Sequence, residues 1–190
     1  MTKYILHGGF TRQDNESSRA FYKEFVRDVP EGSNILLVYL ASREEDNSKK
    51  FEENRESVKR ESEGKSFNFL MATQENFLSE IEKSKAVCFY GGSTNKLIKI
   101  LRTYPDLQPL LEGKTIAGSS AGAYALARFG PSHDEEQIRE GLGLVPVRVV
   151  CHYESSELPP NEKAVSILED TAPELELVFL KDCEWKVFTN

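Results

Sequence analysis

The sequence has few of the residues that build metal centres and disulfide frameworks. It contains 3 cysteines and 3 histidines among 190 residues. The histidines have no HExxH or CxxC companions, so we expect no zinc site and no bound metal. The cysteines, Cys88, Cys151 and Cys183, are odd in number and widely spaced, which favours reduced thiols over disulfide bonds.

Long apolar runs and excess positive charge are also missing. The longest apolar run, residues 35–41, is far shorter than the roughly 18 residues that cross a bilayer. Lys and Arg total 24 against 31 Asp and Glu, a net charge of −7, which repels phosphate backbones and anionic lipid. We therefore expect no nucleic-acid partner and no membrane partner. No signal-peptide core precedes Gly8. The expected reduced thiols favour a cytoplasmic protein.

What the chain does have is a regular alternation of short apolar runs and amphipathic stretches, which predicts one α/β domain over residues 1–190. Strands are predicted at 3–7, 35–41, 66–71, 86–90, 114–117, 144–151, 175–180 and 185–188, the last two forming a pair. Helices are predicted at 18–29, 45–64, 73–82 with Thr73 as its cap, 95–102, about 121–128, and 160–170. This order predicts a three-layer sandwich, a mostly parallel sheet with helices on both faces. The charged face of 45–64 is interpreted as solvent-exposed.

The segment Gly118-Ser119-Ser120-Ala121-Gly122 has the GxSxG pattern of a nucleophile elbow, between a predicted strand and a predicted helix. A sharp turn there forces the serine into a strained conformation with its hydroxyl exposed, and glycines two positions away on each side allow close backbone approach. Free N–H groups at the helix start point to the same place. We therefore expect Ser120 to be a nucleophile and the N–H of Ala121 to stabilise an oxyanion.

A serine nucleophile needs a base, and the base needs an acidic partner. His152 follows the strand predicted at 144–151, so it should lie at the same sheet edge as Ser120. His7 and His133 are weaker candidates. Asp182 is the first choice for the acid because it follows the strand predicted at 175–180. The alternatives are Glu184, Asp134, Glu135 and Glu154.

A second glycine turn, Gly91-Gly92-Ser93-Thr94, also lies between a strand and a helix. The backbone N–H of Gly92 could approach the reaction centre as a second oxyanion donor. A phosphate-binding loop would need a GxxxxGK[ST] frame, which the chain does not contain.

These residues resemble the peptidase E (aspartyl dipeptidase) family of serine peptidases. The resemblance rests on Gly91 to Leu97, Gly118 to Ala123, and Leu142 to Pro146 leading to Cys151 to Tyr153. It implies the class I glutamine amidotransferase-like fold, Ser120 as nucleophile, His152 as base, and an oxyanion hole at Gly92 and Ala121. The segment from Leu180 to Trp185 matches a family stretch whose acid falls on Asp182.

The implied reaction is hydrolysis of short peptides after an N-terminal aspartate, through an acyl-enzyme and without a cofactor. Family members commonly have Asn at the position of Ser93 and a bulky residue at that of Ser119, so the substrate is less well indicated than the nucleophile. Candidates for a cation that holds the aspartate side chain are Arg128, Arg139 and Arg148.

Two other functions remain open at this point. A small α/β-hydrolase esterase would have its acid between the nucleophile and the histidine, whereas the order Ser120, His152, Asp182 places the acid last. A non-catalytic amidotransferase-like binding domain would keep the elbow without turnover, and a fluorophosphonate would then fail to label Ser120. The sequence does not indicate the oligomeric state.

Overall fold

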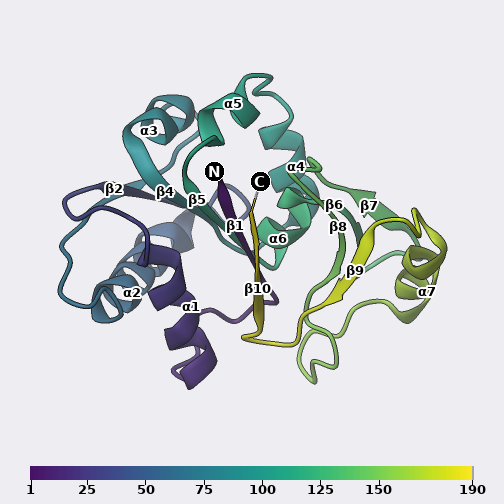
Figure 1. Ribbon diagram of the computed structural model, residues 1–190. Helices are drawn as coiled ribbons and strands as arrows, with labels where there is room; N and C mark the ends of the chain where they lie inside the picture. The colour runs from purple at the N-terminus through teal and green to yellow at the C-terminus, as the bar shows by residue number, and fades with distance from the viewer. Residues whose placement is uncertain (190) are drawn as a thin grey trace.

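Two β-sheets organise the molecule, a computed structural model that describes residues 1–189. Within that range a six-stranded sheet has the order β10-β1-β5-β4-β2-β3 and a four-stranded sheet the order β7-β6-β8-β9 (Figure 1). The large sheet comprises β1 (Lys3–His7), β2 (Asn34–Val38), β3 (Asn68–Met71), β4 (Ser84–Phe89), β5 (Thr115–Ser119) and β10 (Trp185–Thr189). The small sheet comprises β6 (Ala127–Pro131), β7 (Ile138–Glu140), β8 (Val145–Val150) and β9 (Glu176–Phe179).

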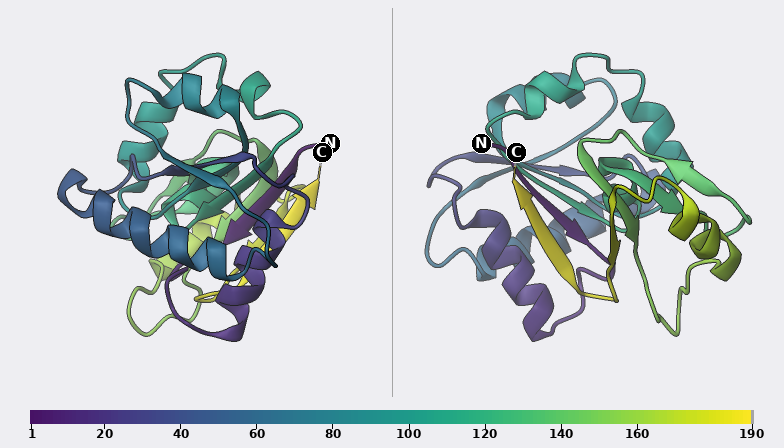
Figure 2. Two further views of the ribbon diagram at one scale, coloured as in Figure 1. Left: turned by 90° about the vertical axis from the view of Figure 1, so that its left-hand side faces the viewer. Right: turned by 45° about the vertical axis from the view of Figure 1, so that its right-hand side comes forward.

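Strand pairing is parallel except at β10 and β7, which are antiparallel to β1 and β6. Helices cover both faces of the large sheet, as the two views of Figure 2 show. One face carries α1 (Glu16–Val26) and α2 (Asn47–Arg60), the latter preceded by a short 3-10 helix, η1 (Glu44–Asp46). The other carries α3 (Phe77–Lys83), α4 (Thr94–Leu101), α5 (Leu107–Leu111) and α6 (Ala121–Leu126), and α7 (Glu162–Asp170) covers the small sheet. The predicted α/β class, with helices on both faces of a mostly parallel sheet, is confirmed.

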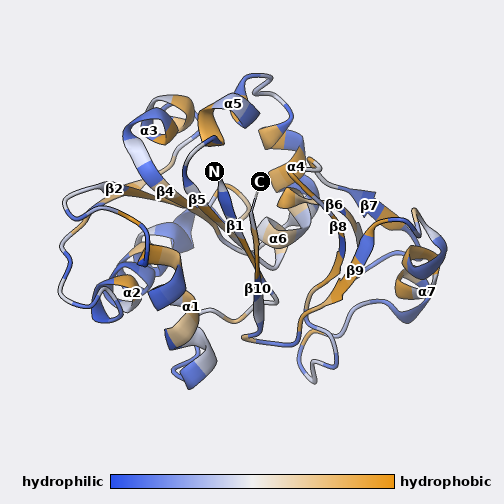
Figure 3. Cartoon of the chain, viewed as in Figure 1, coloured by the Kyte–Doolittle hydropathy of each residue, from blue (hydrophilic) through white to orange (hydrophobic). Residues whose placement is uncertain are grey.

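The continuous apolar run in β2 follows from this double cover. Ile35 and Leu37 pack with α1 and α2, whereas Leu36 and Val38 pack in the core on the opposite face. All four are buried, as expected of a strand covered on both sides. Figure 3 shows the same arrangement, with apolar residues along the strands and polar residues on the outer helix surfaces.

Helix α6 lies between the two sheets. It packs against β5 of the large sheet and β8 of the small sheet, and all of its residues are buried. One hydrophobic core therefore extends from Leu36 and Phe89 through Leu126 to Val147 and Val149. This continuity fixes the small sheet against the large one and sets the relation between the loops that each contributes.

Three local predictions are wrong. The helix expected to reach about residue 128 ends at Leu126, and β6 and β7 follow where a turn was expected. The strands expected as a closing pair belong to different sheets, because β9 pairs with β8 and β10 with β1. The helix expected from Thr73 begins at Phe77, since Thr73 and Asn76 instead exchange hydrogen bonds in a turn, Thr73 N–H to Asn76 Oδ1 (2.7 Å) and Asn76 N–H to Thr73 Oγ1 (3.2 Å).

No helix within residues 1–189 is both long enough and apolar enough to span a bilayer.

Candidate active site

The turn between β5 and α6 has the strained geometry expected of a nucleophile elbow. Ser120 adopts φ 52° and ψ −110°, a region that non-glycine residues rarely occupy. A Cβ on Gly118 would lie 2.6 Å from the Gly122 backbone, and one on Gly122 would lie 2.1 Å from the carbonyl oxygen of Phe89. The steric reason for glycine on both sides of Ser120 is thus confirmed.

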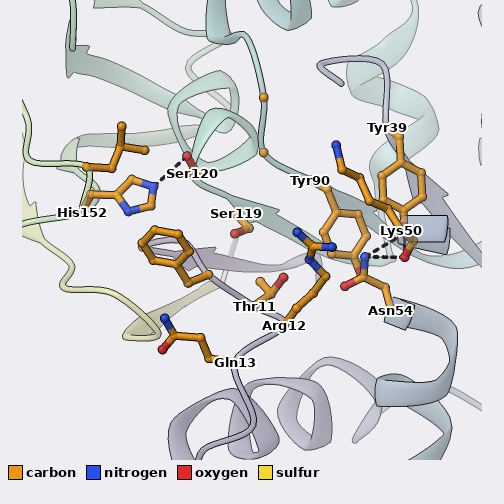
Figure 4. Close-up of a pocket in the computed structure, with 14 residues that line it drawn as sticks. Thr11, Arg12, Gln13, Tyr39, Lys50, Asn54, Tyr90, Ser119, Ser120 and His152 are labelled. Atoms are coloured by element: carbon orange, nitrogen blue, oxygen red, sulfur yellow. Dashed lines mark hydrogen bonds between the residues drawn. The ribbon is translucent and has the colours of Figure 1, made fainter. Parts of the chain in front are cut away.

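His152 lies beside the Ser120 hydroxyl, with 3.0 Å between its Nε2 and Ser120 Oγ (Figure 4). The imidazole is almost fully buried, its side chain 3% exposed, and the ring of Phe10 packs edge-on against it at 5.1 Å. His152 follows β8 of the small sheet, whereas Ser120 follows β5 of the large sheet. The two side chains therefore meet as predicted, but they come from two sheets and not from one edge of a single sheet.

The other ring nitrogen of His152 faces a carboxylate. Nδ1 lies 2.7 Å from Oδ1 of Asp182, whose side chain is 26% exposed. This contact fixes the tautomer: Nδ1 carries the proton and donates it to the carboxylate, which leaves Nε2 free to accept from Ser120. The other acidic candidates make no hydrogen bond to His152 within residues 1–189; they are Asp134, Glu135, Glu154 and Glu184.

Three successive carbonyl groups at the end of β1 hold this arrangement together. The carbonyl oxygen of His7 accepts from Ser120 N–H at 3.0 Å, that of Gly8 from His152 N–H at 3.1 Å, and that of Gly9 from Cys183 N–H at 3.0 Å. The side chain next to Cys183 is Asp182, so the turn after β1 touches all three segments of the site. No sequence pattern indicated this role for Gly8 and Gly9.

The second glycine turn lies directly against the elbow. A Cβ on Gly91 would be 3.4 Å from Ser120 Cβ, and Gly92, at φ 146°, is in a conformation that favours glycine. Within residues 1–189 the N–H of Gly92 has no hydrogen-bond acceptor. Ala121 is the first residue of α6, so its N–H has no acceptor within the helix. Within the described residues 1–189 the two predicted oxyanion donors thus have no hydrogen-bond acceptor, and both adjoin Ser120.

A pocket of about 470 Å³ opens beside Ser120 and His152. Its far wall carries polar and cationic side chains that sequence reasoning missed: Arg12, Tyr39, Lys50, Asn54 and Tyr90. Lys50 and Asn54 come from α2, whose charged residues were interpreted only as a solvent-exposed face. The buried Asn54, 2% exposed and one turn before Val58 on the inner side of the helix, was the available signal.

Hydrogen bonds order this wall. Asn54 donates to the Tyr39 hydroxyl at 3.0 Å and accepts from the Tyr22 hydroxyl at 2.7 Å. Burial raises the pKa of Tyr39 and keeps the phenol neutral. Arg12 Nη1 pairs with Glu53 Oε2 at 2.5 Å, which leaves its other N–H donors for a further anion.

The three arginines proposed from the sequence do not line this pocket. Arg148 is buried and donates to the carbonyl oxygens of Leu168, Glu169 and Leu175, so it holds α7 against the small sheet. Arg128 pairs with Glu140 on β7. Arg139 lies on β7, within a different pocket.

The two remaining histidines are neighbours of the site without touching Ser120 Oγ. His7 is fully buried, and burial, with the nearby His152 as a smaller cause, lowers its pKa to about 3. Its Nδ1 accepts from Gly9 N–H at 3.0 Å. His133 stacks edge-on to His152 at 5.9 Å, and burial lowers its pKa as well. Both are therefore neutral neighbours of the imidazole at neutral pH.

Comparison with known proteins agrees with this geometry. The model of peptidase family S51 matches residues 5–190. No curated protein matches the chain. Among solved structures, a peptidase from an acI-B1 Actinobacterium superposes with a TM-score of 0.76 at 22% identity, covering 99% of this chain and 83% of that one. A peptidase E candidate from Listeria monocytogenes EGD-e superposes with a TM-score of 0.66 at 16% identity, covering 100% and 98%. At these identities the two structures establish the fold.

Proposed function

This chain belongs to peptidase family S51, and from that membership we propose that it hydrolyses the peptide bond after an N-terminal aspartate through an acyl-enzyme on Ser120. Family membership makes it a serine-type peptidase with peptides as its class of substrate. The assignment of Ser120, His152 and Asp182 as the catalytic triad is our proposal. The observation that carries it is the continuous hydrogen-bonded chain from Ser120 Oγ through the imidazole to Asp182 Oδ1.

In the acylation half of the reaction, His152 Nε2 takes the hydroxyl proton as Ser120 Oγ attacks the substrate carbonyl carbon. The carbonyl π electrons move to oxygen, and the N–H groups of Gly92 and Ala121 donate to that oxyanion. Asp182 stabilises the imidazolium that forms. His152 then gives the proton to the leaving amine as the C–N bond breaks, which leaves an ester on Ser120.

Deacylation repeats these steps with water. His152 removes a proton from the water as its oxygen attacks the ester carbonyl, and the same two N–H groups hold the second oxyanion. Collapse of this intermediate breaks the bond to Ser120 Oγ, which regains its proton from the imidazolium. The amino acid leaves as a free carboxylic acid, and no cofactor enters the cycle.

Selectivity for an acidic residue is supported by the charge of the pocket wall. Arg12 and Lys50 line the pocket that contains Ser120 and His152. A guanidinium group binds a carboxylate through paired donors, and an ammonium group adds a point charge. We assign the aspartate side chain of the substrate to this wall, with Arg12 as its principal partner.

Ser120→Ala and His152→Ala should each lower kcat by several orders of magnitude while the fold is kept, because triad members act as a unit. The measurement is hydrolysis of Asp-X dipeptides, with labelling of Ser120 by a fluorophosphonate as a second readout. Equal labelling of the parent and of Ser120→Ala would contradict the nucleophile assignment. An unlabelled parent would indicate a binding domain.

The pocket wall is tested by substrate preference. Loss of a hydrogen bond to a charged group costs about 1.5–3 kcal/mol, so Arg12→Gln should lower kcat/KM for Asp-X by about 10- to 100-fold and leave kcat/KM for Asn-X nearly unchanged. Arg19→Gln is the matched control, because Arg19 is an exposed arginine that pairs with Asp14 and does not line the pocket. A panel of Asp-X, Glu-X and β-aspartyl dipeptides then identifies the preferred substrate. An unaltered Asp-X to Asn-X ratio in Arg12→Gln would refute the assignment.

We further propose a cytoplasmic location. The support is that Cys88, Cys151 and Cys183 are all free thiols, which suits a reducing compartment. The net charge of −7 likewise supports small peptides, and not nucleic acid, as partners. Cell fractionation with an antibody to the protein tests the location directly.

A further inference from the structure

The segment that follows β2 contacts the Gly91–Gly92 turn, which also adjoins Ser120. Ser93 N–H donates to the carbonyl oxygen of Ala41 at 2.9 Å, and the Ser42 hydroxyl donates to the carbonyl oxygen of Gly91 at 3.2 Å. A Cβ on Gly92 would lie 2.3 Å from the Ala41 carbonyl oxygen, so the two segments are in direct contact. The glycine turn is thus held between Ala41–Ser42 and the elbow.

The bond from Ser42 determines which way the next peptide N–H points. The Gly91 carbonyl and the Gly92 N–H belong to one planar peptide unit, and the structure contains no cis peptide within residues 1–189. In a trans peptide these two groups point in opposite directions. Because Ser42 holds the carbonyl on its own side, the N–H of Gly92 is directed away from Ser42. Gly92 also lines the pocket that contains Ser120.

Ser42 is itself held in place by several hydrogen bonds. Its N–H donates to the Tyr39 carbonyl at 2.8 Å, and its carbonyl accepts from Lys96 Nζ at 2.9 Å. Its hydroxyl oxygen accepts from Lys50 Nζ at 3.2 Å, and the residue is only 6% exposed. Since the ammonium group has only donors, its contact leaves the hydroxyl hydrogen of Ser42 free to point to Gly91. The result is one directed chain, Lys50 to Ser42 to Gly91.

We propose that Ser42 is a positioning residue for the oxyanion hole, orienting the Gly91–Gly92 peptide so that the Gly92 N–H meets the developing oxyanion, with Lys50 orienting the Ser42 hydroxyl. This inference rests on the proposed function, because it assigns a purpose to the oxyanion donors of that reaction. A role of this kind affects the transition state and leaves ground-state binding of the substrate nearly unchanged.

The test compares Ser42→Ala with Ser42→Thr, which keeps the hydroxyl. Loss of a direct oxyanion donor costs about 10²–10³ in kcat, so loss of the residue that orients one should lower kcat for an aspartyl p-nitroanilide by about tenfold, with KM within about twofold. Ser42→Thr should recover most of the loss. An aldehyde analogue of aspartate, which forms a tetrahedral adduct with Ser120, should bind Ser42→Ala more weakly by a factor similar to the loss in kcat.

Ser84→Ala is the matched control. Ser84 is also buried and donates to a backbone carbonyl, that of Glu80 at 2.7 Å, but it lies at the opposite end of β4 from the glycine turn. Both variants should lower the melting temperature by a similar amount, and only Ser42→Ala should lower kcat. A kcat unchanged in Ser42→Ala, a loss confined to KM, or an equal loss in Ser84→Ala would overturn the proposal.

The rate of Ser120 labelling by a fluorophosphonate separates this inference from the proposed function. Phosphonylation also places an oxygen in the oxyanion hole, and it needs no cognate peptide. If the parent is labelled but does not cleave the anilide, the substrate proposal fails while the labelling rates of the Ser42 variants still decide the inference. Slower labelling of Ser42→Ala, restored in Ser42→Thr, supports it, and equal rates overturn it.

Discussion

Unusual backbone angles gather at the residues of the proposed triad. Ser120 and His152 have φ values of 52° and 56°, and Cys183, which adjoins Asp182, has 65°. Non-glycine residues seldom adopt such angles, and each costs of order 1–3 kcal/mol unless the surrounding structure enforces it. Here each of the three residues donates a backbone hydrogen bond, Ser120 to the last residue of β1 and His152 and Cys183 to the turn that follows it.

The identity of the acid can be decided by two amide substitutions in one loop. Asp182→Asn should lower kcat by about 10⁴-fold, because an amide at this position favours the wrong imidazole tautomer. Glu184→Gln is the matched control, since Glu184 Oε2 accepts from Lys181 N–H at 2.9 Å and does not contact His152. Its kcat should stay close to that of the parent. Similar, small losses in both variants would shift attention to Asp134 or Glu154.

The residues with a recognisable local pattern could be predicted from the sequence, and those without one could not. Ser120 and its flanking glycines are indicated by their spacing. His152 and Asp182 are indicated by their positions after apolar runs. Arg12 follows the first glycine turn, and Lys50 lies within a stretch rich in charge, so neither stands out from its neighbours. Their convergence on one pocket depends on how α2 packs against the sheet, which is a tertiary property.

At the scale of elements, the loop from β1 to α1 has little room for side chains where it passes the site. Gly8 has no room for a side chain, because a Cβ would lie 2.1 Å from the Lys181 carbonyl oxygen. Gly9, at φ 127°, faces the imidazole, and a Cβ would lie 2.0 Å from His152 Cε1. The absence of side chains at Gly8 and Gly9 therefore determines how closely the His152 imidazole packs against this loop.

Gly9→Ala should consequently reduce both stability and turnover. The methyl group must displace the imidazole from Ser120, and a lost transition-state contact of about 3 kcal/mol corresponds to about 100-fold in kcat. Gly32→Ala is the control: Gly32 also has a positive φ, 75°, but nothing lies within 4 Å of its Cβ position. That variant should lose about 1 kcal/mol of unfolding free energy and keep its kcat. Full activity in Gly9→Ala would show that the ring position does not depend on this loop.

The elements of the large sheet were easier to predict than those of the small one. Strands β1, β2, β4 and β5 are short apolar runs bounded by glycine or polar turns, and the predicted ranges overlap all of them. Strand β6 contains Gly130 and Pro131 and continues directly from α6, so the sequence resembles a helix end followed by a turn. Its pairing with β8 depends on residues far along the chain, which no local pattern records.

At the scale of the whole molecule, we propose that the two sheets unfold together as one domain. Helix α6 contributes to a core shared by both, and the turn after β1 hydrogen-bonds to segments from each. Family S51 matches the chain from residue 5 to residue 190 as one unit, which supports the same proposal. A single transition observed by all probes in urea would agree with it.

His7 gives this unfolding a specific pH dependence. Its folded pKa of about 3 lies below the ordinary value of 6.5, so the unfolded chain binds a proton that the folded protein excludes. The stability that depends on a neutral His7 is fully present above about pH 6.5 and is lost as the pH falls toward 3. By pH 4 the free energy of unfolding should have fallen by about 3 kcal/mol on this account. In His7→Asn, which keeps an acceptor for Gly9 N–H and does not titrate, this contribution should be missing.

The measurement is the unfolding free energy of both proteins in urea between about pH 7 and pH 4. His7→Asn should be less stable at neutral pH because of its lost contact with Phe21, and the difference should shrink or reverse on acidification. Two parallel curves would mean that His7 takes up a proton equally well in the folded and unfolded states.

Ser120 follows a strand of the large sheet, whereas His152 follows a strand of the small sheet. A shift of a fraction of an ångström between the two sheets would therefore lengthen the 3.0 Å contact between these side chains without unfolding either sheet. Mild heat or hydrostatic pressure should then silence turnover while circular dichroism still reports intact secondary structure. The catalytic rate of this protein should therefore detect small changes in the alignment of its two sheets that circular dichroism does not detect.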